Sequence, residues 1–321
     1  MKMHSLLLAV CCSVGAIAGT VPREQISADA KWVVHLDVDS LLETQLGKFV
    51  GRELVDPKAS KLSAALKQQF ELDLDWRQIH SLTAYGTDFK DPAKANGVLL
   101  VRSGLDVGGA LATVFEKLQA NGGGAEVPLR KVQDQPFPIY SFQDSVFGAA
   151  LGPELFALAH SRAQLEKAQR ILSGQAANLA STTSLPDRAG QPSGFLTVAI
   201  ADTAAAGAGL PPQARLLKDA LGAQLIAGEK SDKLFVNAAL DARDAAVAVQ
   251  LQQALQGVIA FAQLTELDNK ELKQLAQAAK VGGNEKTVTL DVQVPVTDVI
   301  DRMGKPQKKR RAQAQKPAEC Q

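Results

Sequence analysis

The residues best suited to chemistry by type and spacing are His35, Asp37 and Asp39, which alternate with aliphatic residues. Alternate residues of a β-strand lie on one face, so an imidazole and two carboxylates could share a metal ion there. The alternative is that this face contacts solvent and that Asp39 assists the start of a helix.

A weaker copy of this segment occurs 163 residues later and separates these alternatives. The corresponding positions there are Val198, Ile200 and Asp202, so two of the three are aliphatic. The repeated segment therefore does not require the polar set. The sequence favours a solvent-facing structural role and predicts neither a metal nor another cofactor.

Two His-Ser pairs, His80-Ser81 and His160-Ser161, could be interpreted as a base beside a nucleophile. Adjacent residues of a strand point to opposite faces, which disfavours both pairs. Ser161 is better explained as a helix cap, because Gln164 follows it with capping-box spacing. A hydrolase stays open as an alternative, although the sequence has no Gly-x-Ser-x-Gly motif.

Other common sites of chemistry are also missing from the sequence. Gly122 to Gly124 follow a predicted helix rather than a strand, which is a poor arrangement for binding phosphate. There is no Walker motif, dinucleotide fingerprint, Cys-x-x-Cys pair or His-Glu-x-x-His motif. The sequence therefore assigns no catalytic residue.

The polar set lies in a segment, residues 31–50, around which the rest of the chain can be arranged. An alternating pattern of period two predicts a strand, and the pattern then changes to helical spacing. Ser40 and Glu43 stand at the joint with the spacing of a capping box. The segment therefore predicts a strand that runs directly into a helix.

Periodicity and turn residues extend this pattern along both halves of the chain. Further helices are predicted at 41–54, 62–70, 106–118, 161–172, 241–262, 268–280 and 296–303. Strands are predicted at 82–86, 98–101, 138–142, 146–151, 155–159, 223–227, 234–238 and 287–294. Leu105-Asp106 matches Leu240-Asp241 at an offset of 135, and Asp106 and Asp241 are each predicted to cap the helix that follows.

We therefore predict an α+β fold of two related halves. Each half is expected to be a mainly antiparallel sheet with helices packed on one face. The predicted divisions are a signal peptide at 1–19, a first half at 20–172, a linker at 173–193, a second half at 194–304 and a disordered basic tail at 305–321.

Three short strings carry a resemblance to known proteins. Residues 32–37 read W-V-V-H-L-D, residues 82–86 read L-T-A-Y-G, and residues 158–161 read L-A-H-S. These strings resemble secreted bacterial proteins of a domain-of-unknown-function type, over most of 31–172 and more weakly over 194–304. The resemblance implies an exported protein with a duplicated α+β unit, and it supplies no activity.

The N-terminus predicts export to the periplasm or the extracellular space. Lys2 precedes an apolar run, and Ala16-Ile17-Ala18 fits the small-x-small cleavage pattern. The alternative is an uncleaved anchor. After cleavage only Cys320 remains, which excludes an internal disulfide.

Charge is distributed unevenly along the chain. The tail at 305–321 has a net charge of +5, and Lys2 adds +1. Because the whole chain has a net charge of +1, about −5 remains on residues 20–304. The tail contains a run of four cations, Lys308, Lys309, Arg310 and Arg311. We predict weak contact of this run with anionic membrane surfaces and no specific nucleic-acid binding, because an exported protein does not meet the genome.

These observations favour an exported non-enzymatic protein that binds a protein, peptide or lipid, or supports the structure of the cell envelope. The alternative is a hydrolase-type enzyme with its site between the halves. A cleft lined by convergent His, Asp and Ser side chains would favour the enzyme, and an apolar groove without them would favour binding.

Overall fold

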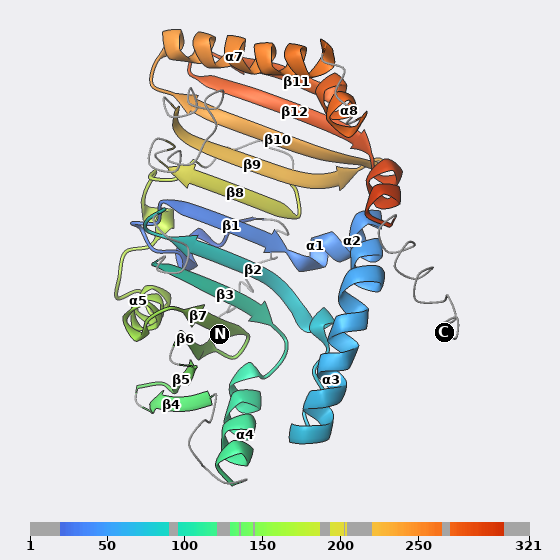
Figure 1. Ribbon diagram of the computed structural model, residues 1–321. Coiled ribbons are helices and arrows are strands. Elements are labelled where there is room, and N and C mark those ends of the chain that lie inside the picture. Colours follow the sequence, from blue (N-terminus) through green and yellow to red (C-terminus); the bar gives the residue numbers. More distant parts are fainter. Residues whose placement is uncertain are drawn as a thin grey trace, which may run out of the picture.

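The computed structural model describes residues 20–89, 96–120, 129–134, 136–143, 145–186, 193–201, 203, 220–264 and 270–304 (Figure 1). Its helices are η1 (Arg23–Gln25), α1 (Val38–Glu43), α2 (Gln45–Val50), η2 (Gly51–Val55), α3 (Asp56–Phe70), η3 (Trp76–Gln78), α4 (Val107–Ala120), α5 (Arg162–Leu172), η4 (Leu179–Ser181), α7 (Ala245–Leu264) and α8 (Lys270–Ala278). Residues 296–304 form one further helix.

The strands form a single antiparallel sheet. They are β1 (Trp32–Asp37), β2 (Ile79–Gly86), β3 (Gly97–Ser103), β4 (Leu129–Gln133), β5 (Ile139–Phe142), β6 (Val146–Gly152), β7 (Leu155–Ala159), β8 (Leu196–Ala201), β9 (Ala220–Lys230), β10 (Lys233–Ala242), β11 (Ala279–Asn284) and β12 (Thr287–Pro295). Their order is β11-β12-β10-β9-β8-β1-β2-β3-β7-β6-β5-β4. The predicted antiparallel α+β fold is confirmed, and its two halves join through β1 and β8 into one continuous sheet.

Two of the three sequence strings behind the family resemblance, residues 32–37 and 82–86, pair with each other across β1 and β2. Trp32 lies opposite Gly86, and His35 lies opposite Thr83. A Cβ atom placed on Gly86 would lie 2.5 Å from Cζ2 of Trp32, so the indole ring covers the glycine. The tryptophan and the glycine of the two strings therefore form one packing unit.

The strand-to-helix joint is confirmed, but its cap differs from the prediction. The Asp37 carboxylate accepts a hydrogen bond from the Ser40 backbone N–H at 2.8 Å and another from the Ser40 hydroxyl at 2.8 Å. The strand ends at Asp37, so Asp37 rather than Ser40 is the N-cap, and Ser40 lies inside α1. Likewise, Asp241 lies within β10, and it is Asp244 that accepts from the Val247 N–H at the start of α7.

The predicted orientation of β1 is wrong. His35 and Asp37 are only 4% and 7% exposed, because their face of the sheet packs under α5, η1 and η4 in the first half. We call this side, which carries Val33 and His35 of β1, the α5 face. The opposite side, which carries Trp32 and Val34 of β1, is the α7 face, since α7 packs on it in the second half.

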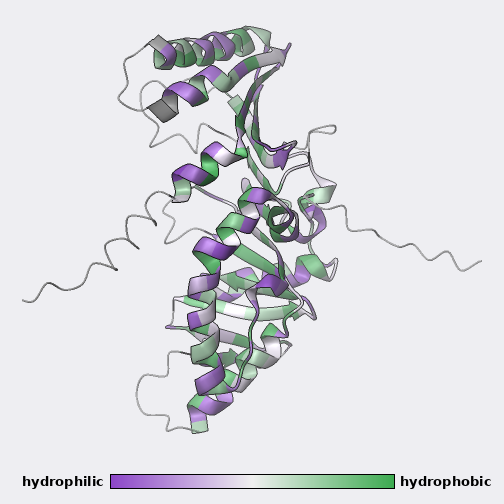
Figure 2. Ribbon diagram, turned by 90° about the vertical axis from the view of Figure 1, so that its right-hand side faces the viewer, coloured by the Kyte–Doolittle hydropathy of each residue, from purple (hydrophilic) through white to green (hydrophobic). Residues whose placement is uncertain are grey.

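Helices cover both faces of the first half rather than one. The Phe115 ring of α4 makes an edge contact with Tyr140, at 6.0 Å between centroids, and Tyr140 lies on the α7 face of β5. In contrast, Leu165 and Ala168 of α5 pack on the α5 face. The long helical segment formed by α2, η2 and α3 lies along the ends of the strands (Figure 2).

Part of the segment predicted as a linker packs into the first core. Leu179 and Leu185 are each 1% exposed, and Asn178 forms an isolated bridge with Ser27. These residues therefore belong to the folded first half, although their composition resembles that of a linker. Residues 187–192 of the same segment lie outside the described part of the chain.

The two halves share a strand order on either side of the β1–β8 pair. Counted outward from this pair, the order β1-β2-β3-β7-β6 in the first half corresponds to the order β8-β9-β10-β12-β11 in the second half. The sequence repeat with an offset of 163 does not match the structure at the level of single residues, however. The repeat makes His35 equivalent to Val198, whereas in the sheet His35 pairs with Thr197, and Val34 pairs with Val198. Paired residues share a face, so His35 and Val198 lie on opposite faces. Duplication stays a hypothesis.

Candidate functional site

The proposed metal ligands do not converge. The His35 Nδ1 atom lies 2.9 Å from the Thr83 hydroxyl, and both residues are buried. Burial lowers the pKa of the His35 imidazole, and the nearby Asp37 carboxylate opposes that shift. His35 therefore belongs to a buried pair in the sheet, and its neutral form is favoured.

The two carboxylates have other partners. Asp37 caps α1, as described above, and the Asp39 carboxylate pairs with His80 at 2.9 Å on an exposed surface. Among the described residues, no group of three or more His, Cys, Asp and Glu side chains is placed to hold a metal ion. His35, Asp37 and Asp39 thus have three separate structural surroundings.

Neither His-Ser pair forms a nucleophile–base contact. The Ser161 hydroxyl accepts from the Gln164 N–H, and the Gln164 side chain accepts in return from the Ser161 N–H, which confirms the predicted capping box. His160 Nδ1 lies 3.2 Å from the Ser145 carbonyl oxygen. His80 pairs with Asp39 rather than with Ser81. Ser161 thus acts as a helix cap, and His80 and Ser81 lie within β2.

Two further sequence predictions lie outside the described residues. They are the glycine run at 122–124 and the cationic run Lys308, Lys309, Arg310 and Arg311. The predicted signal peptide at 1–19 also lies outside them.

The most unusual described surface is on α7, at the top of the molecule in Figures 1 and 2. Its twenty residues include no Asp, Glu, Lys or Arg. Ala248 and Leu251 are buried against the second core, whereas Val249, Val258 and Phe261 are 53%, 50% and 68% exposed. Residues of an α-helix are spaced about 100° apart, so Val258 lies about half a turn away from Val249, and the three residues do not lie on a single side of the helix. The exposed glutamines Gln250, Gln253 and Gln256 lie among them. We call the solvent-exposed part of α7 that carries Val249, Val258 and Phe261 the α7 outer surface.

The periodicity of α7 gave only part of this arrangement. It placed Val247, Leu251, Leu255, Val258 and Ala262 on one side of the helix. Leu251 is indeed buried and Leu255 packs beside it, but Val258 is half exposed. The missed signal was the lack of charge over twenty residues, since an ordinary surface helix carries charges on its outer face.

By length and composition, residues 245–263 of α7 could cross a membrane. Of the most apolar stretch within these residues, 11% is buried. The core helix of a soluble protein is mostly buried, whereas α7 covers the sheet with one side and leaves the other open. The helix therefore presents an uncharged surface that the described chain does not cover.

The α7 face of the sheet also carries an apolar hollow, of about 280 Å³, in the first half. Its walls come mainly from aliphatic and aromatic side chains of neighbouring strands, including Trp32, Leu99, Val146 and Leu158. Among the described residues that line it, His160 is the one titratable group. An apolar hollow without convergent His, Asp and Ser groups favours binding over acid–base catalysis.

Comparison with known proteins gives no family. No protein-family description matches the sequence, and no curated protein matches it. Among solved structures, crystal form IV of TP0453 aligns with a TM-score of 0.46 and 8% identity, over 89% of this chain and 97% of that chain. Crystal form III of TP0453 gives 0.44 and 10%, over 88% and 98%. Similarities this distant carry no information on function.

Proposed function

We propose that this chain is an exported, non-enzymatic binding protein of the cell envelope, and that the α7 outer surface attaches it to the lipid interface. The observation that supports this proposal is the exposure of Val249, Val258 and Phe261 on a helix without charged residues. Burial of apolar side chains in the interface is favourable, and a charged side chain there would be costly.

The size of the surface favours a membrane over a second copy of the chain. A helix of twenty residues is about 30 Å long and about 10 Å wide, so the outer surface offers about 300 Å². A stable protein interface buries about 800 Å² on each partner. Insertion into the lipid interface needs no matching partner surface and can use a narrow helical strip.

The basic tail provides a second, electrostatic contribution in this proposal. Each cation near an anionic membrane contributes about 1 kcal/mol, and the attraction decays over about 8 Å at physiological salt. The tail therefore favours anionic membranes in a salt-dependent manner, whereas α7 acts on neutral lipid as well.

Flotation with phospholipid vesicles tests the proposal. Val249→Lys combined with Phe261→Lys is expected to weaken binding to uncharged phosphatidylcholine vesicles at least about tenfold, because two apolar contacts become charges. Leu62→Lys is the matched control, since Leu62 is 61% exposed on α3, and it should leave binding unchanged. Deletion of residues 305–321 should weaken only the binding to anionic vesicles at low salt.

Two results would contradict membrane binding through the α7 outer surface. The double lysine variant could float as well as the parent, or the parent could fail to bind vesicles. In the second case, retention in the envelope fraction would indicate a protein partner instead.

Export is tested separately by N-terminal sequencing, which should show cleavage near Ala18. An intact Met1 on the soluble protein would exclude a cleaved signal peptide.

A further inference from the structure

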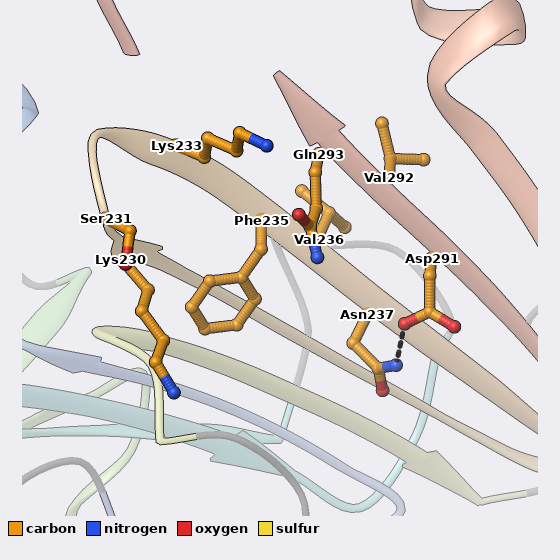
Figure 3. A pocket seen from close by; sticks show the side chains of 9 residues that line it. All are labelled: Lys230, Ser231, Lys233, Phe235, Val236, Asn237, Asp291, Val292 and Gln293. Atoms are coloured by element: carbon orange, nitrogen blue, oxygen red, sulfur yellow. Dashed lines mark hydrogen bonds between the residues drawn. The ribbon is translucent and has the colours of Figure 1, made fainter. Parts of the chain in front are cut away.

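A second hollow, of about 350 Å³, lies on the α5 face of β9, β10 and β12 (Figure 3). It is far along the sheet from α5, which contacts β3, β6 and β7. The lining residues include an aromatic ring, planar polar side chains and two lysines, and they are Lys230, Ser231, Lys233, Phe235, Val236, Asn237, Asp291, Val292 and Gln293.

The aromatic ring is fixed by the neighbouring strand. A Cβ atom on Gly228 would lie 2.5 Å from Cζ of Phe235 and 2.9 Å from Cα of Gly194, so the ring extends over backbone that carries no side chain. Gly228 is the residue opposite Phe235 in the β9–β10 ladder. Phe235 remains partly exposed, and its ring therefore forms a pre-positioned apolar platform.

Planar polar groups lie along one side of this platform. The Asn237 side-chain amide donates a hydrogen bond to the Asp291 carboxylate, which orients both groups across β10 and β12 (Figure 3). The Asn237 carbonyl oxygen and the second carboxylate oxygen remain as acceptors. Gln293, opposite Phe235 on β12, adds an exposed amide that can donate and accept.

Two cations lie at the turn that joins β9 to β10. Lys230 and Lys233 pair across the ladder and are exposed, and neither has an acidic partner within 4 Å among the described residues. The acidic side chain of Glu229 points to the other face, where it accepts from the Gln45 and Leu46 backbone N–H groups at 3.1 and 3.0 Å. Strand alternation thus separates the lysines from the neighbouring acid.

We infer that this hollow binds an acidic carbohydrate. A sugar ring has an apolar C–H face that can stack on Phe235 while its hydroxyl groups bond to Asn237, Asp291 and Gln293. A carboxylate on the sugar would lie beside the two lysines, which are the cations that line the hollow among the residues that the structure describes. The lining residues therefore match the three chemical parts of a uronic acid.

An extended peptide fits this surface less well. β10 is hydrogen-bonded to β9 on one side and to β12 on the other, so it has no free backbone edge. Peptides that add to a sheet depend on such an edge. Recognition here must use side chains alone, which suits a ligand rich in hydroxyl groups. This inference does not depend on the membrane proposal, since α7 packs on the opposite face.

Saturation-transfer NMR and titration calorimetry with oligogalacturonate and its neutral methyl ester test the inference on the full mature chain. The acidic sugar is expected to bind at least about tenfold more tightly than the ester. Lys230→Gln with Lys233→Gln should remove that preference. Phe235→Ala should weaken both sugars about tenfold, since it removes the platform.

Matched control variants show whether a change in sugar affinity comes from the hollow itself. Lys273→Gln with Lys286→Gln removes the same charge from exposed positions outside it and should change neither affinity. Thermal melts identify any variant that fails to fold, and in that case Phe235→Leu replaces Phe235→Ala. Absence of sugar binding would overturn the inference. So would equal loss in the control pair, or equally tight binding of polyglutamate, which would indicate charge attraction alone.

Discussion

Replacement of Gly86 by alanine is expected to destabilise the centre of the sheet through one contact. The added Cβ atom would lie 2.5, 2.6 and 2.7 Å from Cζ2, Cε2 and Nε1 of Trp32. Carbon atoms in contact are normally about 3.5–4.0 Å apart, so the indole ring must move. Its Nε1–H donates to the Asp88 carbonyl oxygen at 2.8 Å, and this hydrogen bond would be lost with the movement.

The magnitude follows from these two effects. Forcing additional volume into a packed site costs about 1–3 kcal/mol, and loss of the hydrogen bond costs about 1 kcal/mol. Alanine reduces the conformational freedom of the unfolded chain, which offsets about 0.5 kcal/mol. The free energy of unfolding should therefore fall by about 1.5–3.5 kcal/mol in Gly86→Ala.

A double-mutant cycle with Trp32→Val isolates the contact. Urea unfolding measures the free energy for the parent, both single variants and the double variant, and tryptophan emission reports whether the indole becomes more exposed. In the Trp32→Val background, Gly86→Ala should cost less than about 0.5 kcal/mol, because the clashing ring is gone. Gly257→Ala is a useful control, since no atom lies within 4 Å of its added Cβ. It should stabilise α7 by about 0.5–1 kcal/mol.

The reasoning is wrong if Gly86→Ala costs the same in both backgrounds. That outcome would mean that the strand backbone at Gly86, rather than the indole ring, requires the glycine. A parent-like stability of Gly86→Ala would show that the ring moves without loss.

Three further changes have expected outcomes. His35→Ala should lower the free energy of unfolding by about 2 kcal/mol, because it leaves the Thr83 hydroxyl without its buried partner. Burial lowers the pKa of His35 in the folded state, so the unfolded state binds a proton at a higher pH than the folded state does. The free energy of unfolding of the parent should therefore decrease as the pH is lowered through about 6.5. The part of this pH dependence that is due to His35 should disappear in His35→Ala. Glu229→Gln should lower the free energy of unfolding in urea by about 1 kcal/mol, because it removes the carboxylate charge that accepts from the Gln45 and Leu46 N–H groups at the start of α2, whereas the exposed control Glu285→Gln should cost almost nothing. Deletion of residues 305–321 should leave the melting temperature nearly unchanged, and a loss of several degrees would show that the tail belongs to the fold.

Local sequence signals determined the type and order of many elements. Residues 155–159 and 287–294 are strands, as predicted, and Ser161 with Gln164 forms the predicted capping box. These features depend on residues close together in the chain, where backbone geometry limits the alternatives. Short β4 and β11 were missed, because a few residues with two glycines or several charges carry no clear period.

The helix around Pro57 shows that a strong local sequence signal can be overridden. The sequence predicted separate helices at 41–54 and 62–70, on either side of Pro57, yet α2, η2 and α3 run without interruption from Gln45 to Phe70. Proline lacks the N–H that an α-helix needs, and the π-helical turn of η2 directly before it accommodates that loss. The choice between a break and a π-turn depends on the packing around it, including Trp76 against Gly51.

The burial of each face was decided only by the tertiary structure. Alternation in β1 showed that its two faces differ, but a period contains no information about which neighbours cover each face. β1 lies between β2 and β8, so His35 meets Thr83 from 48 residues away and becomes buried. The hollow around Phe235 of β10 likewise requires Gly228 from β9 and Asp291 and Gln293 from β12. Such contacts depend on strand order, because only the folded sheet brings distant residues within hydrogen-bonding or van der Waals distance.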